Sequence, residues 1–157
     1  EKLMSICRSV KCVSGKFQLI KQAIPSPGPG QVLIKTAYST INPHDRLQYQ
    51  FKKVEGHVLG SEGCGEIVDV GEGIDKSLIG YHVSFWEHGW SSYCARDADQ
   101  VMHLNKKIDL KVAANSYINP LTSCGFLYVA QNLYKSKGVI LTAGSSNLAR
   151  MFTKFAQ

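Results

Sequence analysis

Gly138-Val139-Ile140-Leu141-Thr142-Ala143 is a short apolar run typical of a β-strand, and Gly144-Ser145-Ser146-Asn147-Leu148-Ala149 is the turn of small residues that follows it. The next apolar residues recur at the three-and-four spacing of a helix with one buried face: Leu148, Met151, Phe152 and Phe155. A strand, a glycine turn and a helix form the first step of a dinucleotide-binding unit, whose helix start holds the pyrophosphate. Because the sequence stops at Gln157, we expect a complete first domain and only the start of a second.

The composition is that of a soluble globular protein. The 157 residues are 44% hydrophobic and 19% charged, which is enough to bury one core and part of another. No apolar run approaches the ~20 residues that cross a bilayer, so no membrane insertion is expected. Five cysteines, an odd number without a C-x-x-C pair, argue against a disulfide framework. A reducing compartment follows, and we expect an intracellular protein of the cytoplasm or the mitochondrial matrix.

The formal charge is +6, but the basic residues are scattered and the longest basic runs are pairs. This pattern is typical of a solvated surface, so no nucleic-acid binding is expected. No acidic residue follows Asp109, whereas five basic ones do: Lys111, Lys135, Lys137, Arg150 and Lys154. They favour an anionic cofactor or partner, or they reflect only where the sequence ends.

The pattern along the chain changes from strands to helices near residue 108. Residues 3–13 and 17–22 predict a hairpin around Ser14-Gly15-Lys16, and the proline-rich residues 25–30 predict a loop. Further short strands are expected at 32–36, 67–70, 82–85, 93–96 and 101–104. Helices are expected at 109–114 and 120–134, with one helical face formed by Leu121, Cys124, Leu127 and Tyr128.

A series of short motifs gives the glycine turn its context, because that turn has one glycine where the nucleotide fingerprint has three. In order, the motifs are Pro27-Gly28-Pro29-Gly30-Gln31-Val32-Leu33-Ile34, Ile41-Asn42-Pro43-His44-Asp45, Leu59-Gly60-Ser61-Glu62-Gly63-Cys64-Gly65-Glu66-Ile67-Val68-Asp69-Val70-Gly71, Gly80-Tyr81-His82-Val83, Gly89-Trp90-Ser91-Ser92-Tyr93, Asn119-Pro120-Leu121-Thr122 and Thr142-Ala143-Gly144. The series resembles the medium-chain dehydrogenase/reductase superfamily, and within it the zinc-independent quinone-oxidoreductase and enoyl-thioester-reductase branch.

The resemblance implies a mainly β chaperonin-10-like barrel, followed by two helices and the first β-α unit of a Rossmann domain, α/β overall. The catalytic domain would occupy residues 1–118, and a linker helix with the start of the nucleotide-binding domain residues 119–157. Substrate and nicotinamide meet between the two domains in this family. The family also implies a small-molecule substrate.

Zinc is not expected, because catalytic zinc needs three Cys, His or carboxylate ligands. In the zinc-dependent branch the ligands would fall on Asn42, Ser61 and Ile118, none of which is a normal zinc ligand. The four-cysteine structural lobe would follow Phe85, where this chain has only three residues before Gly89. The histidines are interpreted as solvated or hydrogen-bonded rather than metal-bound: His44, His57, His82, His88 and His103.

Without a metal, hydride transfer needs a bound nicotinamide, a polarised acceptor and often a proton donor. The resemblance places Asn42 and Asp45 at the floor of the cleft. Enoyl reductases of this group use a tyrosine shortly after this motif, and Tyr49 is the candidate here; the alternative is a tyrosine packed at the barrel edge. Asp45 has the alternative role of a helix cap or turn residue after Pro43.

The cofactor implied by the resemblance is NADPH. Asn119 and Thr122 would lie beside the nicotinamide, where the Thr122 hydroxyl can bond the carboxamide or ribose. The expected pyrophosphate-binding turn comprises Gly144, Ser145, Ser146, Asn147 and Leu148. The residue that separates NAD from NADP falls beyond Gln157.

Two functions remain open from the sequence. The first is the N-terminal part of a zinc-independent NAD(P)H-dependent reductase of activated C=C bonds or quinones, with activity of these 157 residues alone in doubt. The second is a truncated or degenerate relative that serves as a structural or interaction subunit of a larger assembly. In both, residues 120–157 need covering by a missing C-terminal half or by a protein partner, because a lone strand leaves a sheet edge and an apolar helix face open.

Overall fold

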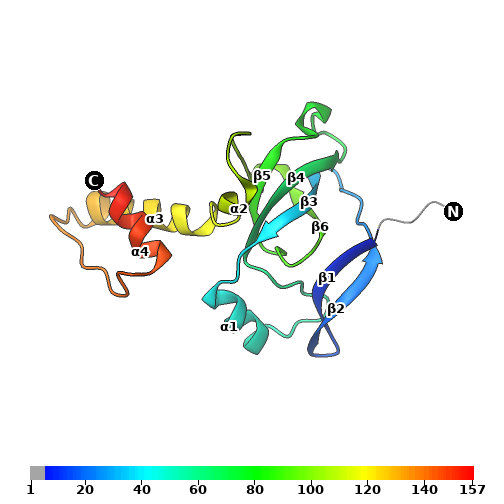
Figure 1. Cartoon of the computed structure of the whole chain (residues 1–157), viewed down its shortest axis with the longest axis horizontal. Helices are drawn as coiled ribbons and strands as arrows, with labels where there is room; N and C mark the ends of the chain where they lie inside the picture. Colours follow the sequence, from blue (N-terminus) through cyan, green and yellow to red (C-terminus); the bar gives the residue numbers. More distant parts are fainter. Residues whose placement is uncertain (1–5) are drawn as a thin grey trace. The chain divides into compact units, whose positions relative to one another are not determined.

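The computed structural model describes residues 6–157. The chain divides into two compact units, the first ending at Asn115 and the second formed by Ser116–Gln157. Figure 1 shows that the first unit is built mainly of strands and the second of helices.

The first unit opens with a two-stranded antiparallel hairpin of β1 (Ile6–Val13) and β2 (Lys16–Ala23). Its register runs from Ile6 opposite Ala23 to Val13 opposite Lys16. The turn has two residues with positive φ, Ser14 at 50° and Gly15 at 74°, as the twist of a tight hairpin requires. The predicted hairpin is confirmed, while residues 3–5 of the predicted strand lie outside the described residues.

The second sheet is antiparallel, with strand order β6-β3-β4-β5-β7. Its strands are β3 (Gln31–Ser39), β4 (Glu62–Val70), β5 (His82–Trp86), β6 (Tyr93–Asp97) and β7 (Val101–His103). The sheet curls into a half-barrel (Figure 1), which confirms the predicted mainly β architecture. Two short 3-10 helices interrupt its loops, Lys76–Leu78 and Ala98–Gln100.

The core of the half-barrel is one cluster of buried side chains contributed by β3, β4, β5 and β6. Its fully or nearly buried members are Val32, Ile34, Ile67, Val83, Phe85 and Cys94. Each large apolar side chain of this kind contributes ~1.5–3 kcal/mol when it leaves water. This burial stabilises the packing of the four strands against one another.

Two glycines let the loop after β5 lie directly against the start of β4. A Cβ at Gly60, whose φ is +102°, would lie 2.4 Å from the backbone nitrogen of Trp90. A Cβ at Gly89 would lie 2.3 Å from the carbonyl oxygen of Glu62. Backbone approach this close requires the absence of a side chain.

Helix α1 (Pro43–Phe51) connects β3 to the segment before β4 and was not expected from the pattern. Pro43 stands at the first helical turn, where its missing N–H is not needed. Asp45 at the third helical position accepts a hydrogen bond from the backbone N–H of Asn42, as in a capping box. The unit ends with the short α2 (Leu110–Ala113), which Asp109 caps by accepting from the Lys111 N–H.

The second unit comprises α3 (Ile118–Tyr128), a π-helical turn (Val129–Leu133) and α4 (Asn147–Phe155). Both expected helices are present. The helical face formed by Leu121, Cys124, Leu127 and Tyr128 is largely exposed in α3, and the buried residue of this helix is Ser123. The reason is that the surfaces packed against α3 among the described residues do not cover that stripe.

The predicted strand at Val139–Ala143 is wrong as well. Residues 138–141 have no regular structure and 142–145 form a turn, with Ala143 at φ 50°. Ile140 is 95% exposed and Val139 50% exposed. A strand needs a neighbour to complete its hydrogen-bond ladder, and the described residues offer none beside this segment. Of the expected first β-α unit, residues 138–157 show a turn and a helix but no strand.

Candidate active site

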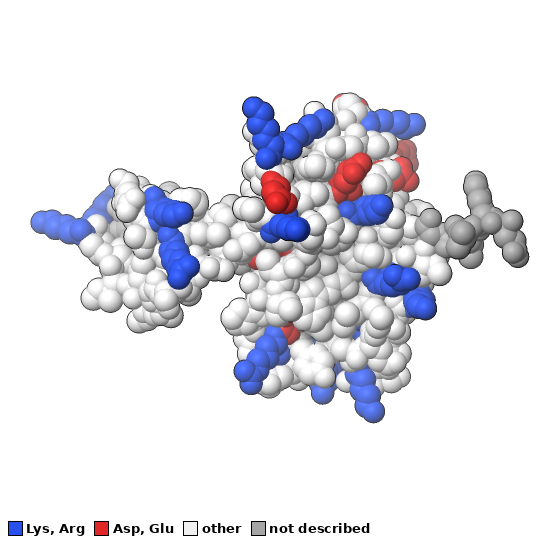
Figure 2. Space-filling model, viewed as in Figure 1, with Lys and Arg blue, Asp and Glu red and all other residues white. Residues whose placement is uncertain are grey.

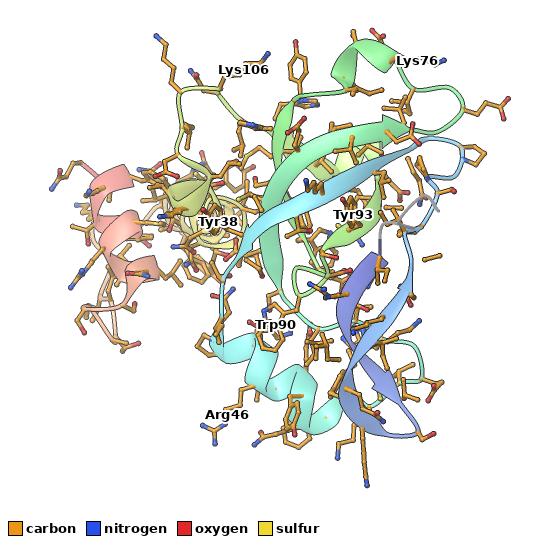
Figure 3. All side chains as sticks on the ribbon, turned by 45° about the vertical axis from the view of Figure 1, so that its right-hand side comes forward. Tyr38, Arg46, Lys76, Trp90, Tyr93 and Lys106 are labelled. Atoms are coloured by element: carbon orange, nitrogen blue, oxygen red, sulfur yellow. The ribbon has the colours of Figure 1, made fainter. Side chains whose placement is uncertain are left out.

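A cluster of polar side chains lies where the first turn of α1 meets the start of β4. It consists of Thr40, Asn42, His44 and Asp45 from the β3–α1 region, with Ser61 and Glu62 from the other side. Trp90 closes the cluster by donating its indole N–H to the Thr40 carbonyl at 3.0 Å, and Figure 3 shows it beside the start of α1. Arg46, on the same helix, points outward instead (Figure 3).

Asp45 is the centre of the cluster and is only 1% exposed. Its Oδ2 accepts the Asn42 backbone N–H at 2.6 Å. Its Oδ1 accepts both the backbone N–H of Ser61, at 2.7 Å, and the Ser61 hydroxyl, at 2.6 Å. Three donors compensate the burial of this carboxylate and fix α1 to the start of β4. The capping role is thus observed, and a part in catalysis stays a prediction.

Asn42 is held by a second buried carboxylate, that of Glu62. The Asn42 amide donates to Thr40 Oγ1 at 2.9 Å and to Glu62 Oε1 at 3.1 Å, and Thr40 Oγ1 is 3.2 Å from the same Glu62 oxygen. Glu62 is a site residue that the sequence pattern did not predict. A charged residue inside the glycine-rich run 59–65 was the available signal, because charge is rarely buried without a specific partner.

Three histidines continue the network away from Asp45. His44 Nδ1 lies 3.2 Å from the Ser61 hydroxyl, and the buried Gln48 side chain bridges His44, at 3.5 Å, and His57, at 3.4 Å. The rings of His57 and His88 are 6.3 Å apart. His88 Nδ1 in turn lies 3.3 Å from Arg96 Nη1. Nothing in the sequence spacing of these histidines predicts that Gln48 bridges two of them.

Two of these imidazoles are kept neutral. Burial lowers the pKa of His88 to about 4, with a further contribution from the Arg96 guanidinium. Burial, and then the charge of Lys52, lowers the pKa of His57. Glu87 and His88 both have positive φ, at 59° and 60°, in the tight turn after β5. Non-glycine residues in this conformation are uncommon and carry backbone strain.

Tyr49 lies apart from this cluster. Its ring stacks on Phe17 of β2, with 5.5 Å between centroids, and the side chain is 57% exposed. The two rings line a shallow cavity of about 220 Å³ together with Gly15, Lys16 and Lys53. No hydrogen bond joins the Tyr49 hydroxyl to Asn42 or Asp45 in residues 6–157. Its catalytic role stays a prediction that this geometry does not favour.

The expected cofactor residues lie in the second unit. Asn119 and Thr122 are in the first turns of α3, where the Asn119 carbonyl accepts the Ser123 hydroxyl at 2.9 Å. Gly144 and Ser145 belong to the exposed turn before α4. Ser146 caps α4 by accepting the Ala149 N–H at 3.2 Å. Asn147 and Leu148 are the first helical residues.

The turn before α4 offers backbone donors of the kind that bind a pyrophosphate. The N–H groups of Asn147 and Leu148 have no acceptor within the helix, because the first donors of any helix lack one. A Cβ at Gly144 would meet only the Leu141 carbonyl, at 4.0 Å, so the approach is open. The second unit carries basic side chains and no acidic ones (Figure 2). The residues present therefore fit the phosphate part of a dinucleotide.

Asn42 and Ser61, the two residues of the first unit at positions where the resemblance expects zinc ligands in the zinc-dependent branch, both make hydrogen bonds within the protein. Asn42 uses its amide on Thr40 and Glu62, and Ser61 uses its hydroxyl on Asp45. Across residues 6–157, no three His, Cys, Asp or Glu side chains are grouped to hold a metal ion.

All five cysteines are free thiols, and burial raises the pKa of Cys94 to about 12 and of Cys64 to about 11. No helix in this part of the chain is long and apolar enough to span a membrane.

Comparison with known proteins identifies the fold family. Residues 28–126 match the alcohol dehydrogenase GroES-like domain. The mitochondrial enoyl-[acyl-carrier-protein] reductase of Caenorhabditis elegans is 33% identical over 142 residues, which is 85% of this chain and 41% of that protein. The chain thus spans less than half the length of this relative.

Solved structures give the same result. A structure described as an NADPH:quinone reductase of Mesorhizobium loti has a TM-score of 0.76 at 28% identity, covering 98% of this chain and 49% of that one. A mycobacterial protein complexed with NADPH shares the fold, with a TM-score of 0.79 at 23% identity over 95% of this chain and 49% of its own. The chain belongs to the medium-chain dehydrogenase/reductase superfamily, and its first unit is the GroES-like domain of that superfamily.

Proposed function

We propose that the chain is part of a zinc-independent, NADPH-dependent reductase that acts on an activated carbon–carbon double bond or a quinone. The observation that carries the proposal is the cluster around Asp45. In this cluster the amide of Asn42 and the hydroxyl of Ser61 stand at positions where the zinc-dependent branch has metal ligands, and the imidazole of His44 lies beside them. Both Asn42 and Ser61 are engaged in hydrogen bonds within the protein. The coarser class, an NAD(P)H oxidoreductase of this superfamily, is supported by the relatives.

NADPH is the proposed cofactor, and it would supply the hydride. The N–H groups of Asn147 and Leu148 would bind its pyrophosphate, with Gly144, Ser145 and Ser146 forming the turn. Asn119 and Thr122 would bind the nicotinamide side, as the family resemblance implies. The first unit would then orient the small-molecule substrate through Asn42 and Asp45, whose positions the capping contacts fix.

The test is a reductase assay on the native protein, with NADPH oxidation followed in the presence of a trans-2-enoyl thioester or a quinone. Turnover without added metal, unchanged by a chelator, supports the proposal. Stoichiometric zinc in the purified protein by elemental analysis, or activity that depends on added zinc, would contradict it. The Asn42→Ala variant should lose activity, while the Asp99→Ala variant, altered at an exposed position, serves as the matched control.

A covering partner for the second unit is also proposed. Two shallow apolar cavities of about 410 and 370 Å³ lie around Phe152, lined in part by Phe126 and by residues 139–141. Side chains of this kind gain ~1.5–3 kcal/mol each by leaving water. Either further residues of the same polypeptide or a second subunit would cover them. An intact polypeptide mass well above 17.3 kDa supports further residues of the same chain, and a mass near 17.3 kDa supports a second subunit.

The same surface favours one alternative function, that of a structural or interaction subunit. This alternative predicts tight assembly and no turnover with any enoyl or quinone substrate.

The proposed compartment is a reducing one, the cytoplasm or the mitochondrial matrix, in keeping with five free thiols. Localisation of a tagged native protein by microscopy tests the compartment.

A further inference from the structure

His44 is the one imidazole of the histidine network that is both exposed and anchored to the Asp45 cluster. Its Nδ1 lies 3.2 Å from the Ser61 hydroxyl, while the ring as a whole is solvent-exposed in the first turn of α1. His57 and His88 are more enclosed and face Gln48 and Arg96. The feature to be explained is therefore a surface imidazole with one nitrogen fixed by a buried pair.

The direction of the hydrogen bonds follows from Asp45. Both of its oxygens already accept backbone N–H groups, from Asn42 and Ser61, so the carboxylate acts as an acceptor. The Ser61 hydroxyl, 2.6 Å from Oδ1, must then donate its only proton to Asp45. Ser61 Oγ has lone pairs left and no proton, so the contact with His44 requires a proton on His44 Nδ1. The pair Asp45 and Ser61 thus selects one tautomer.

A second contact opposes this assignment, because the Gln48 amide nitrogen is itself a donor and would need an unprotonated His44 Nδ1 as its acceptor. Gln48 Nε2 is 3.5 Å from the same His44 Nδ1, longer than the contact with Ser61 by 0.3 Å. Two donors cannot share a hydrogen bond, so the shorter and charge-assisted chain through Ser61 decides the tautomer. Nε2 of His44 then has its lone pair exposed and has no hydrogen-bond partner within residues 6–157.

Resting on the proposed function, we propose that His44 is the proton donor of the reductase, with Ser61 and Asp45 as its positioning residues. In the protonated ring both nitrogens carry a proton, and Nδ1–H stays bonded to Ser61. The proton on Nε2 is the one available for transfer. A buried carboxylate that acts through a hydroxyl on an imidazole holds the ring in one orientation.

The step balances in atoms and electrons. A bound reduced nicotinamide would supply a hydride to the β-carbon of the activated double bond, and the π electrons would move toward the activating carbonyl to give an enolate. The α-carbon of that enolate takes the proton from His44 Nε2, and neutral His44 regains a proton from water. One C=C bond becomes CH–CH, the nicotinamide is oxidised, and one solvent proton is consumed.

Tyr49 is the competing donor from the sequence, and its geometry is less suitable. Its ring is stacked on Phe17 and its hydroxyl is not joined to the Asp45 cluster. Tyr49 lies four positions after Asp45, but its side chain packs against the β1–β2 hairpin, whereas the His44 side chain contacts Ser61. The two assignments give opposite outcomes in the substitutions below.

The first measurement is the tautomer of His44, read from nitrogen-15 shifts of the imidazole in the native protein at neutral pH. We expect Nδ1–H in the unaltered protein and a mixture of tautomers in Ser61→Ala. His103, on β7 at a distance from Ser61 along the sheet, is the internal reference and should be the same in both proteins. Nε2–H as the main tautomer of His44 would overturn the proposal, whatever the activity.

The second measurement is the pH profile of the native enzyme with an enoyl thioester. Activity should fall as the pH rises, because the donor must be protonated. His44→Gln should lower kcat by about 10²-fold or more with KM changed less than about threefold, and should flatten the profile. Tyr49→Phe and His103→Gln should leave kcat within about twofold.

The outcomes separate the two proposals. Activity of His44→Gln near that of the unaltered protein, or loss of activity in Tyr49→Phe instead, overturns the role of His44 and leaves the reductase intact. Absence of turnover in the unaltered protein overturns the proposed function and the proton transfer with it. Circular dichroism of each variant must match the unaltered protein, because His44→Gln preserves the helix and removes only the ring.

Discussion

The hydroxyl of Ser61 donates to Asp45 Oδ1 at 2.6 Å, and the backbone N–H of the same residue donates to the same oxygen at 2.7 Å. One carboxylate oxygen thus fixes both the start of β4 and the side chain that faces His44. The opposite oxygen caps α1 through Asn42. The stability of the domain and the chemistry of the proposed site therefore depend on the same buried group.

Removing this group should be costly. In Asp45→Ala, two backbone donors and one hydroxyl lose their acceptor in a buried position, so the free energy of unfolding should fall by about 2–4 kcal/mol. Urea unfolding followed by tryptophan fluorescence measures the change. Asp99→Ala, at an exposed aspartate, should change the value by less than about 0.5 kcal/mol. An equal effect of the two substitutions would show that the Asp45 contacts do not stabilise the fold.

Gly89→Ala should destabilise the first unit by about 2–3 kcal/mol, because the added Cβ would lie 2.3 Å from the Glu62 carbonyl oxygen. The φ of Gly89 is not positive, so the effect comes from the close approach alone. Gly138→Ala is the matched control, since a Cβ there meets no atom within 4 Å. Thermal unfolding of the two variants measures the difference, and a Gly89→Ala protein as stable as the control would refute the close contact.

Stability should fall as the pH falls from about 6.5 to about 4. Burial and Arg96 lower the pKa of His88 to about 4 in the folded protein, while an unfolded histidine has a pKa of about 6.5. The unfolded state binds more protons in this window, so the stabilisation is present above pH 6.5 and is lost on acidification.

The expected loss is about 2 kcal/mol, reduced from the full shift because the ring is only partly buried. Urea unfolding at pH 7, 5.5 and 4.5 measures it. His88→Asn, which tolerates the positive φ, should flatten this dependence, whereas His103→Gln should not. A His88→Asn protein with the same pH dependence as the unaltered protein would locate the proton uptake elsewhere.

The 157-residue chain alone should bind NADPH more weakly than micromolar. The turn before α4 offers donors for the pyrophosphate, but these cannot offset the entropic cost of fixing a flexible dinucleotide without an adenosine pocket. Titration calorimetry of the chain and of the native protein compares the two affinities. Micromolar or tighter binding by the chain on its own would contradict this expectation.

Residues 139–143 should exchange their amide hydrogens rapidly in the 157-residue chain and slowly in the native protein. They have no ladder partner within the described residues, and Ile140 is 95% exposed. Ile140→Ala should accordingly leave the stability of the chain within about 0.5 kcal/mol and destabilise the native protein by about 2–4 kcal/mol. Strong protection in the chain alone would mean that no covering partner is needed.

The sequence predicted the elements whose causes are local. The hairpin follows from Ser14-Gly15, and the strands of the half-barrel follow from turn residues between alternating apolar runs. The strand at Val139–Ala143 was wrong because an apolar run specifies burial, while a strand also needs a partner ladder. Helix α1 was missed because its nine residues include the exposed apolar side chains Leu47 and Phe51, which hide its buried face.

Only the part of the candidate site that depends on neighbouring residues in the sequence was predicted. Asn42 and Asp45 lie three positions apart in one short motif and share a capping box, so the sequence motif alone can identify them. The contact between His44 and Ser61 spans 17 residues and depends on how β4 meets α1. This contact cannot be predicted from the sequence pattern without the fold. The same is true of the stacking of Tyr49 on Phe17.

The hairpin has a consequence for self-association. Among the described residues β2 pairs only with β1, so its other side presents unpaired backbone groups along an edge strand. Such an edge is a template for strand addition by a second molecule. Lys16 and Lys21 are exposed on β2, and the like charges of two copies repel when their edges approach. Replacing these lysines would leave the fold intact while opening a route to edge-to-edge aggregation.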